Sequence, residues 1–188
     1  VLPDLVADPV ADEVLSTDAS DGSVRLLLRF AGFVHNKGQG ALEIRGSRPS
    51  TASAMSVTQR LFDAGGAWHD DPSAAQLAYE DGDGHLHWHL MHAARYSLWN
   101  SERSAQAAPA MKVGFCLEDS QHADPQGPRR RVYGGTRDHR FCEQGNPNAL
   151  SVFQGISAGW RDEYHNALAF QWVDVSSVQP GYYWLRSD

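Results

Sequence analysis

The sequence predicts an all-β protein, with a β-sandwich core of short antiparallel strands, long loops and little helix. Two observations predict this class. Short runs of apolar, β-branched and aromatic residues recur along the 188-residue chain, and clusters of Gly, Pro, Asn and Asp separate them. Residues 57–64 carry an apolar spacing that would also suit a short helix. Such strands are typical of sandwiches and barrels, and a chain of this length is most simply one domain, residues 1–188.

Residues 1–20 are expected to form an extended lead-in, in which the prolines favour turns. The first strands are expected at residues 24–30 and 41–44, separated by a turn at residues 32–40. A histidine-rich strand at residues 85–90 is expected to continue to residue 99. Further strands are expected at residues 111–117, 167–175 and 182–185, and loops at residues 47–54, 70–72, 101–110, 119–131 and 179–181.

The composition narrows the classes of partner. The net charge of -7 argues against nucleic acid, and it is compatible with a cationic partner. No run of eighteen apolar residues is present, so no membrane span is expected. The chain does not begin with Met and shows no signal peptide, as expected for a mature or trimmed product.

The two cysteines, Cys116 and Cys142, leave three possibilities open: a disulfide, two free buried thiols or part of a metal site. If they are paired, they close a loop of about 26 residues, worth roughly 3–4 kcal/mol in the chain-entropy account. A disulfide would in turn imply an oxidising compartment.

Three of the nine histidines lie at alternate positions, His85, His87 and His89. On a strand they would share one face, roughly 6.5–7 Å apart, while Leu86, Trp88 and Leu90 would pack into the core from the other face. Three imidazoles without a thiolate suit Cu, Zn, Fe or Ni, and Cu(II) binds such a set most tightly. The alternative is a run of surface or core histidines that binds no metal.

Several segments between residues 2 and 185 carry a family pattern in a fixed order. They are residues 2–6, 24–30, 34–38 and 47–49, the H-x-H-x-H motif at 85–89, the K-x-x-F-C-L-E-D motif at 112–119, and residues 162–164, 171–174 and 180–181. Together these segments resemble the catalytic domain of lysyl oxidases, the copper amine oxidases that act on peptidyl lysine. The histidine motif alone is moderately specific, whereas all the segments in order are highly specific.

The resemblance implies a role for each matched residue. His85, His87 and His89 correspond to the copper ligands, and protein short of copper would hold zinc there as a precursor. Lys112 and Tyr164 correspond to the pair that forms lysine tyrosylquinone, the family's self-generated cofactor. Cys116 and Cys142 correspond to a disulfide beside that lysine. Without the motifs, Lys112 would be taken for a surface lysine and Tyr164 for one of several loop tyrosines.

The implied activity is the oxidation of a primary amine, either a lysine-bearing protein or a small amine, by O₂ to an aldehyde with release of H₂O₂ and ammonia. Cofactor formation requires the neutral Lys112 amine, which a low-dielectric surrounding favours. The base that removes the substrate's α-proton is expected to be Asp162 or His92. Family members often carry a histidine at the position of Arg95, and His165 would point away from Tyr164 on an extended strand.

The chain departs from the family pattern in three places. It has fewer cysteines than animal members, residues 50–84 are expected to form a long loop that gates the site, and the chain stops soon after Leu185, which suggests a trimmed end. The resemblance to lysyl oxidases implies that the protein is secreted. Two other classes remain open: a secreted non-catalytic metal-binding β-sandwich module, and a hydrolase or oxygenase that uses zinc or iron. Neither class needs the pair of Lys112 and Tyr164.

Overall fold

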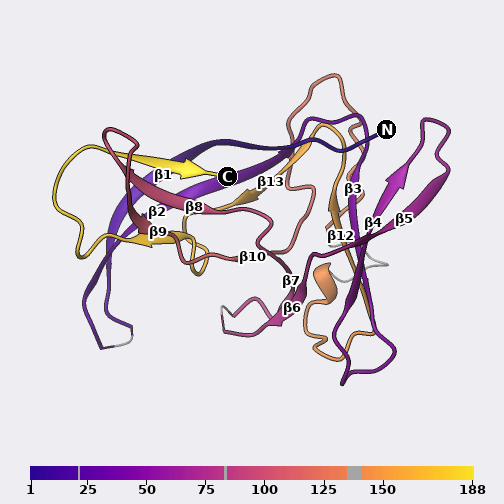
Figure 1. Ribbon diagram of the computed structural model, residues 1–188, viewed down its shortest axis with the longest axis horizontal. Helices are drawn as coiled ribbons and strands as arrows, with labels where there is room; N and C mark the ends of the chain where they lie inside the picture. Colours follow the sequence, from indigo (N-terminus) through magenta and orange to yellow (C-terminus); the bar gives the residue numbers. More distant parts are fainter. Residues whose placement is uncertain (21, 83, 135–140) are drawn as a thin grey trace. The chain divides into compact units, whose positions relative to one another are not determined.

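The computed structural model describes residues 1–20, 22–82, 84–134 and 141–188. These residues form antiparallel sheets and one short 3₁₀ turn, η1 (Phe141–Glu143), so the predicted all-β class with long loops and little helix is confirmed (Figure 1). The strands are β1 (Leu5–Asp18), β2 (Arg25–Asn36), β3 (Leu42–Ser47), β4 (Ser56–Phe62), β5 (Trp68–Ser73), β6 (Leu77–Glu80), β7 (His87–Met91), β8 (Tyr96–Asn100), β9 (Gln106–Pro109), β10 (Gly114–Phe115), β11 (Gln121–His122), β12 (Ser151–Ile156), β13 (Trp160–Tyr164), β14 (Trp172–Asp174) and β15 (Tyr183–Ser187).

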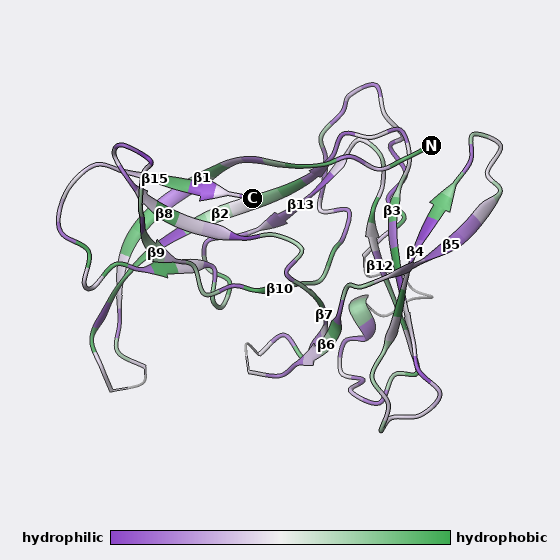
Figure 2. Ribbon diagram, viewed as in Figure 1, coloured by the Kyte–Doolittle hydropathy of each residue, from purple (hydrophilic) through white to green (hydrophobic). Residues whose placement is uncertain are grey.

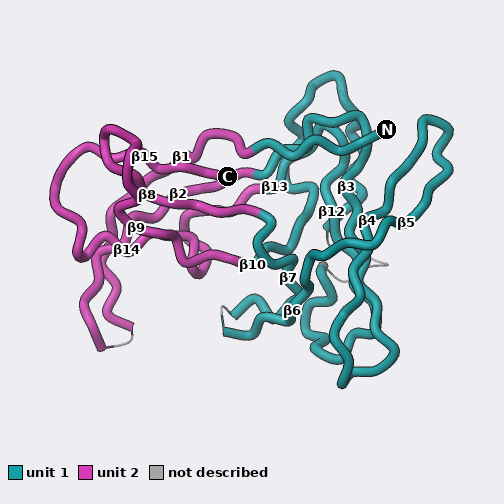
Figure 3. The backbone as a smooth tube through the Cα atoms, in the orientation of Figure 1, with its two compact units in different colours: residues 1–6, 34–93, 114–162 teal, residues 7–33, 94–113, 163–188 magenta. Residues whose placement is uncertain are grey.

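The chain forms two compact units, and each unit combines three separate segments (Figure 3). Unit 1 comprises residues 1–6, 34–93 and 114–162, and unit 2 comprises residues 7–33, 94–113 and 163–188. Neither unit is a continuous stretch of sequence.

Unit 1 contains a four-stranded sheet of order β12-β3-β4-β5 and a three-stranded sheet of order β10-β7-β6. In the second sheet Phe115 pairs with Leu90, and Tyr79 pairs with Trp88. Buried apolar side chains from both sheets, together with Leu117 after β10, form the core of this unit. From the sheets they are Leu42, Ile44, Val57, Leu77, Trp88, Leu90, Phe115, Val152 and Ile156. Strand β7, which carries two of the motif histidines, is therefore an inner strand with a neighbour on each side.

Unit 2 contains a three-stranded sheet of order β15-β8-β9, and β14 pairs with β2 through Trp172 and Arg29. An isolated antiparallel bridge joins Ala110 to Val173. Fully buried Leu27, Phe30 and Val173 belong to its core. Figure 2 shows hydrophobic and hydrophilic residues interspersed along the strands, and no helix among the described residues could cross a lipid bilayer.

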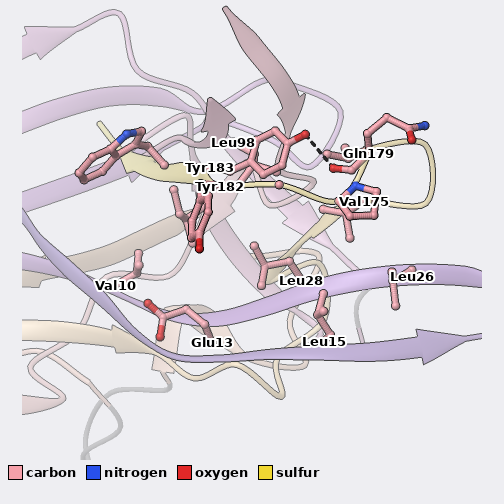
Figure 4. A pocket seen from close by; sticks show the side chains of 15 residues that line it. Val10, Glu13, Leu15, Leu26, Leu28, Leu98, Val175, Gln179, Tyr182 and Tyr183 are labelled. Atoms are coloured by element: carbon pink, nitrogen blue, oxygen red, sulfur yellow. Dashed lines mark hydrogen bonds between the residues drawn. The ribbon is translucent and has the colours of Figure 1, made fainter. Parts of the chain in front are cut away.

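Unit 2 also contains a recess of about 620 Å³ (Figure 4). Its walls come from β1, β2, β8 and the segment at residues 175–185, and they are mostly apolar. Glu13 is the one charged side chain among the lining residues, and the Tyr183 hydroxyl donates a hydrogen bond to the Gln179 carbonyl at 2.8 Å. The side chains of unit 2 therefore leave this space open.

Several predicted loops are strands in the structure. Strand β2 continues to Asn36 through the expected turn, because Gly32 serves close packing: a Cβ atom there would lie 2.2 Å from the Tyr96 hydroxyl. Strand β5 includes the residues 70–72 that were expected to form a loop. It is an edge strand, and edge strands tolerate exposed Asp and Pro. Strands β4, β5 and β6 show that the long loop expected within residues 50–84 was wrong, as was the helical alternative for residues 57–64.

Other predicted strands are shorter or interrupted. The strand expected to continue to residue 99 ends at Met91, because His92 adopts a left-handed conformation with φ of 59° before β8 begins. The strand expected at residues 167–175 is limited to β14, because Phe170 has φ of 61° and a turn precedes it. Only Gly114–Phe115 of the expected strand at residues 111–117 pairs regularly. The final strand, β15, lies where it was predicted.

Candidate metal and active site

The structure brings the three motif histidines of unit 1 together. His87 and His89 lie on β7 and are buried, whereas His85 precedes the strand and is half-buried. One ligand nitrogen from each of the three side chains lies within 4.8 Å of the other two. The Nε2 atoms of His87 and His89 are 2.7 Å apart, and their ring centroids are 4.6 Å apart. This cluster is the one group of at least three metal-ligating side chains found among the described residues.

The cluster is tighter than a straight strand would make it. Strand alternation holds for His87, His89 and the buried Trp88 and Leu90, but Leu86 has φ of 55° and is 46% exposed. The expected packing of Leu86 into the core was therefore wrong, and His85 does not belong to β7. The Leu86 carbonyl accepts hydrogen bonds from the Tyr79 hydroxyl at 2.8 Å and the Gly145 amide at 2.7 Å, which hold this turn in place.

Neighbouring segments of unit 1 support β7 from two sides. A Cβ atom at Gly114 would lie 2.7 Å from Nδ1 of His89, so glycine allows β10 to approach the histidine strand. The Trp88 indole donates a hydrogen bond to the Asn146 carbonyl at 3.0 Å. The disulfide predicted between Cys116 and Cys142 is confirmed, and it ties the segment after β10 to η1, which packs beside β7.

The predicted cofactor pair lies in unit 2. The Lys112 Nζ atom is 5.3 Å from the centroid of the Tyr164 ring, and both residues are only 5% exposed. Met111 and Val113, on either side of Lys112, are about half exposed, so the chain turns the lysine inward and its neighbours outward. Lys112 is therefore not the surface lysine that would be assumed without the motifs.

The candidate bases have different surroundings. Asp162 lies on β13 and is almost completely buried, and its carboxylate accepts hydrogen bonds from the Ser120 hydroxyl at 2.6 Å and the Glu118 amide at 3.1 Å. His92 is exposed in the turn after β7. His165, which follows β13, is also exposed, and its Nδ1 atom accepts a hydrogen bond from the Ala167 amide.

A buried carboxylate organises the segment after the disulfide, and sequence reasoning had noted it only as part of a motif. The fully buried Asp119 accepts hydrogen bonds from the amides of Val132, Tyr133 and Ser157 and from the Ser157 hydroxyl, over distances of 2.7–3.0 Å. Burial raises the pKa of the adjacent Glu118, and its ion pair with Arg131 offsets part of that effect. A pair of acidic residues directly after an apolar run, Glu118 and Asp119, is the signal that could have marked this position.

Comparison with known proteins gives a consistent result. A family model described as lysyl oxidase matches residues 50–188. Lysyl oxidase homolog 1 from Homo sapiens is 28% identical over 94% of this chain and 23% of its own length. Protein-lysine 6-oxidase from Homo sapiens is 28% identical over 98% of this chain and 40% of its own length. The same enzyme from Rattus norvegicus is 32% identical over 61% of this chain and 24% of its own length. The chain therefore spans less than half of these relatives.

Proposed function

This chain belongs to the lysyl oxidase family, and we propose that it is a copper- and quinone-dependent amine oxidase. It converts primary amines, either peptidyl lysine or small amines, to aldehydes. The observation that carries this proposal is the buried Lys112 Nζ atom at 5.3 Å from the ring centroid of the buried Tyr164. A module that only binds metal, or a zinc or iron hydrolase or oxygenase, has no need of this pair.

The histidine cluster fits copper. Metal–nitrogen bonds of about 2 Å allow two ligand nitrogens on one ion to lie up to about 4 Å apart. The ligand nitrogens of the three histidines lie within 4.8 Å of one another, so small side-chain rotations would bring all three within bonding distance of one ion. His85, His87 and His89 would hold the ion, and zinc would take the same ligands in protein short of copper. Copper, when bound, supplies one-electron exchange with O₂.

Lys112 and Tyr164 would together become the organic cofactor, lysine tyrosylquinone. Oxidation of the Tyr164 phenol by one O₂ adds one oxygen to the ring, gives two ring carbonyls and releases one water. The neutral Lys112 amine then forms a C–N bond to a ring carbon, and the ring takes up the electron pair while two protons move to its oxygens. A second O₂ removes two electrons and two protons and leaves as H₂O₂. The burial of Lys112 favours the neutral amine that the addition requires.

In turnover the cofactor supplies an electrophilic carbonyl and an electron sink. One amine, one O₂ and one water give one aldehyde, one ammonia and one H₂O₂. Asp162 and His92 are our two candidates for the base that takes the substrate's α-proton. Asp162→Asn and His92→Asn separate them, because only loss of the true base should remove the low-pH limb from the pH dependence of kcat/KM.

The charge of the chain and its disulfide support the proposed substrate class and location. The net charge of -7 suits a cationic amine as substrate. A lysine in a protein is such an amine, and it is the substrate that the name protein-lysine 6-oxidase gives for that relative. The disulfide supports passage through an oxidising compartment and hence secretion. Because both units are assembled from interleaved segments, we propose that residues 1–188 act as one lysyl oxidase-like catalytic domain.

Peptide mass mapping of protein loaded with copper in air tests the proposal. We expect a peptide in which Lys112 is joined to Tyr164, and we expect Lys112→Ala and Tyr164→Phe to lose it. Lys37→Ala is the matched control, because Lys37 is the only other lysine and is exposed. Unmodified Lys112 and Tyr164 after full copper loading would refute the quinone and favour the non-catalytic metal-binding module.

A further inference from the structure

Gln171 carries a buried carboxamide whose hydrogen-bonding capacity is unused. Its side chain is 0% exposed, and neither Nε2 nor Oε1 has a hydrogen-bond partner among the described residues. A buried amide without partners is destabilising, and most buried polar groups in folded proteins do have a partner. A glutamine retained in such a place therefore calls for a ligand that is formed or bound there.

A backbone contact joins the residues that neighbour Gln171 and the predicted cofactor lysine. Ala110 bridges Val173, and the Met111 amide donates to the Trp172 carbonyl at 3.2 Å. The regular pairing ends there, because the Trp172 amide donates to the Phe170 carbonyl at 2.8 Å and the Gln171 amide donates to the Leu168 carbonyl at 3.3 Å. Lys112 and Gln171 are therefore each one residue away from the bond between Met111 and Trp172. All of these residues belong to unit 2, as does Tyr164.

Strand β2 closes the other side of the carboxamide. The pairing of β14 with β2 begins at Trp172 and Arg29, and Phe30, the next residue of β2, is fully buried. A Cβ atom at Gly32 would lie 3.0 Å from the Gln171 Nε2 atom. The amide is therefore held in the packed interior of unit 2, where its neighbours on β2 are apolar.

We propose that Gln171 is a positioning residue for Lys112 and Tyr164, an inference that rests on the proposed function. Its Oε1 atom accepts a hydrogen bond from the neutral Lys112 amine and orients the lone pair toward the ring. Its Nε2 atom donates to the oxygen that oxidation adds to the Tyr164 ring. Without this donor the new oxygen would be a buried acceptor that lacks a hydrogen bond. Cofactor formation therefore gives hydrogen bonds to the Gln171 carboxamide and to the new oxygen at once. No covalent bond of Gln171 changes.

The test uses Gln171→Met, which keeps the length of the side chain and removes its hydrogen-bonding atoms. In metal-free protein we expect a Tm equal to or above that of the wild type, because an unsatisfied amide has been removed. After copper loading in air we expect the Lys112–Tyr164 link to form at least roughly tenfold more slowly than in the wild type, because loss of one hydrogen bond corresponds to a factor of about ten. We also expect a shifted visible absorption maximum of the quinone.

Gln154→Met is the matched control. Gln154 is also buried, and its Nε2 atom also lacks a hydrogen-bond partner among the described residues. It lies in unit 1, however, and its Oε1 atom accepts a hydrogen bond from the Leu117 amide at 2.9 Å. This variant should lower Tm and leave the rate of link formation unchanged. Gln171→Met with the wild-type rate and absorption would overturn the role of Gln171. A wild-type protein that forms no link would instead refute the proposed function, and the inference with it.

A second measurement keeps the inference testable if Gln171→Met does not fold. In ¹⁵N-labelled wild-type protein, the side-chain amide signals of Gln171 should move downfield when the link forms, because the amide gains hydrogen bonds. Unchanged Gln171 signals in fully linked protein would overturn the proposal.

Discussion

Replacing Asp119 by Asn should destabilise the protein far more than its small change in shape suggests. The Asp119 carboxylate serves four donors: Oδ1 accepts from the Ser157 amide, and Oδ2 accepts from the Val132 and Tyr133 amides and the Ser157 hydroxyl. Asn keeps one oxygen, so its NH₂ group must face at least one N–H. Loss of one charge-assisted hydrogen bond costs about 1.5–3 kcal/mol, and the remaining bonds weaken. We expect a loss of about 2–4 kcal/mol in the free energy of unfolding.

Urea unfolding at neutral pH, followed by tryptophan fluorescence with the disulfide intact and metal removed, measures this loss. Glu118→Gln is the matched control, because it changes the neighbouring acid in the same way. The ion pair of Glu118 with Arg131 is partly exposed, so this variant should change stability by less than about 1 kcal/mol. A value for Asp119→Asn no larger than that of Glu118→Gln would show that the four hydrogen bonds do not anchor the fold.

Three further predictions concern the disulfide, pH and metal. Replacing Cys116 and Cys142 by Ala should lower the free energy of unfolding by roughly 3–4 kcal/mol, because the disulfide spans 26 residues; a urea-measured loss under about 1 kcal/mol would contradict this. Burial raises the pKa of Glu118, so the folded protein holds that proton more tightly and loses stability from this group as pH rises. Glu118→Gln should therefore be more stable relative to the wild type at about pH 7 than at about pH 4, and the opposite order in urea unfolding would refute the assignment. His87→Ala should weaken copper binding by more than about 100-fold in a chelator competition, because loss of a residue that only supports a ligand already lowers metal affinity by about 10–100-fold. His69 is exposed, so His69→Ala should leave copper affinity unchanged. Equal effects of the two variants would argue against the histidine cluster as the copper site.

The sequence predicted the fold class and the final strand because both depend on local composition. It could not predict the long β1, in which Pro9 lies within a strand, because pairing with β2 decides whether such a segment becomes extended. The turn expected around Gly32 failed for a related reason. A glycine in a strand can mark either a turn or a close contact, and only the position of the Tyr96 hydroxyl distinguishes them.

In the candidate site, too, local sequence predicted some features and contacts between distant residues decided others. Alternation predicted that Trp88 and Leu90 would pack into the core, and the structure confirms that both are buried. It could not predict that Leu86 takes a left-handed conformation, since two hydrogen bonds from distant Tyr79 and Gly145 hold its carbonyl. The burial of Lys112 followed from a family motif, because composition alone favours a surface lysine.

The interleaved path of the chain also determines when the molecule can fold during synthesis. Unit 1 needs Val1–Val6 as well as residues up to Asp162, and unit 2 needs Ala7–Phe33 as well as residues up to Asp188. An emerging chain therefore exposes β7 with its histidines before β10, one of its two neighbouring strands, has been made. Contacts so distant in sequence are slow to form, and the unpaired strands are prone to aggregation until then. The segments of the two units alternate along the chain, so truncation of the gene at one end cannot isolate either unit. Removal of the last strand alone would leave unit 2 incomplete.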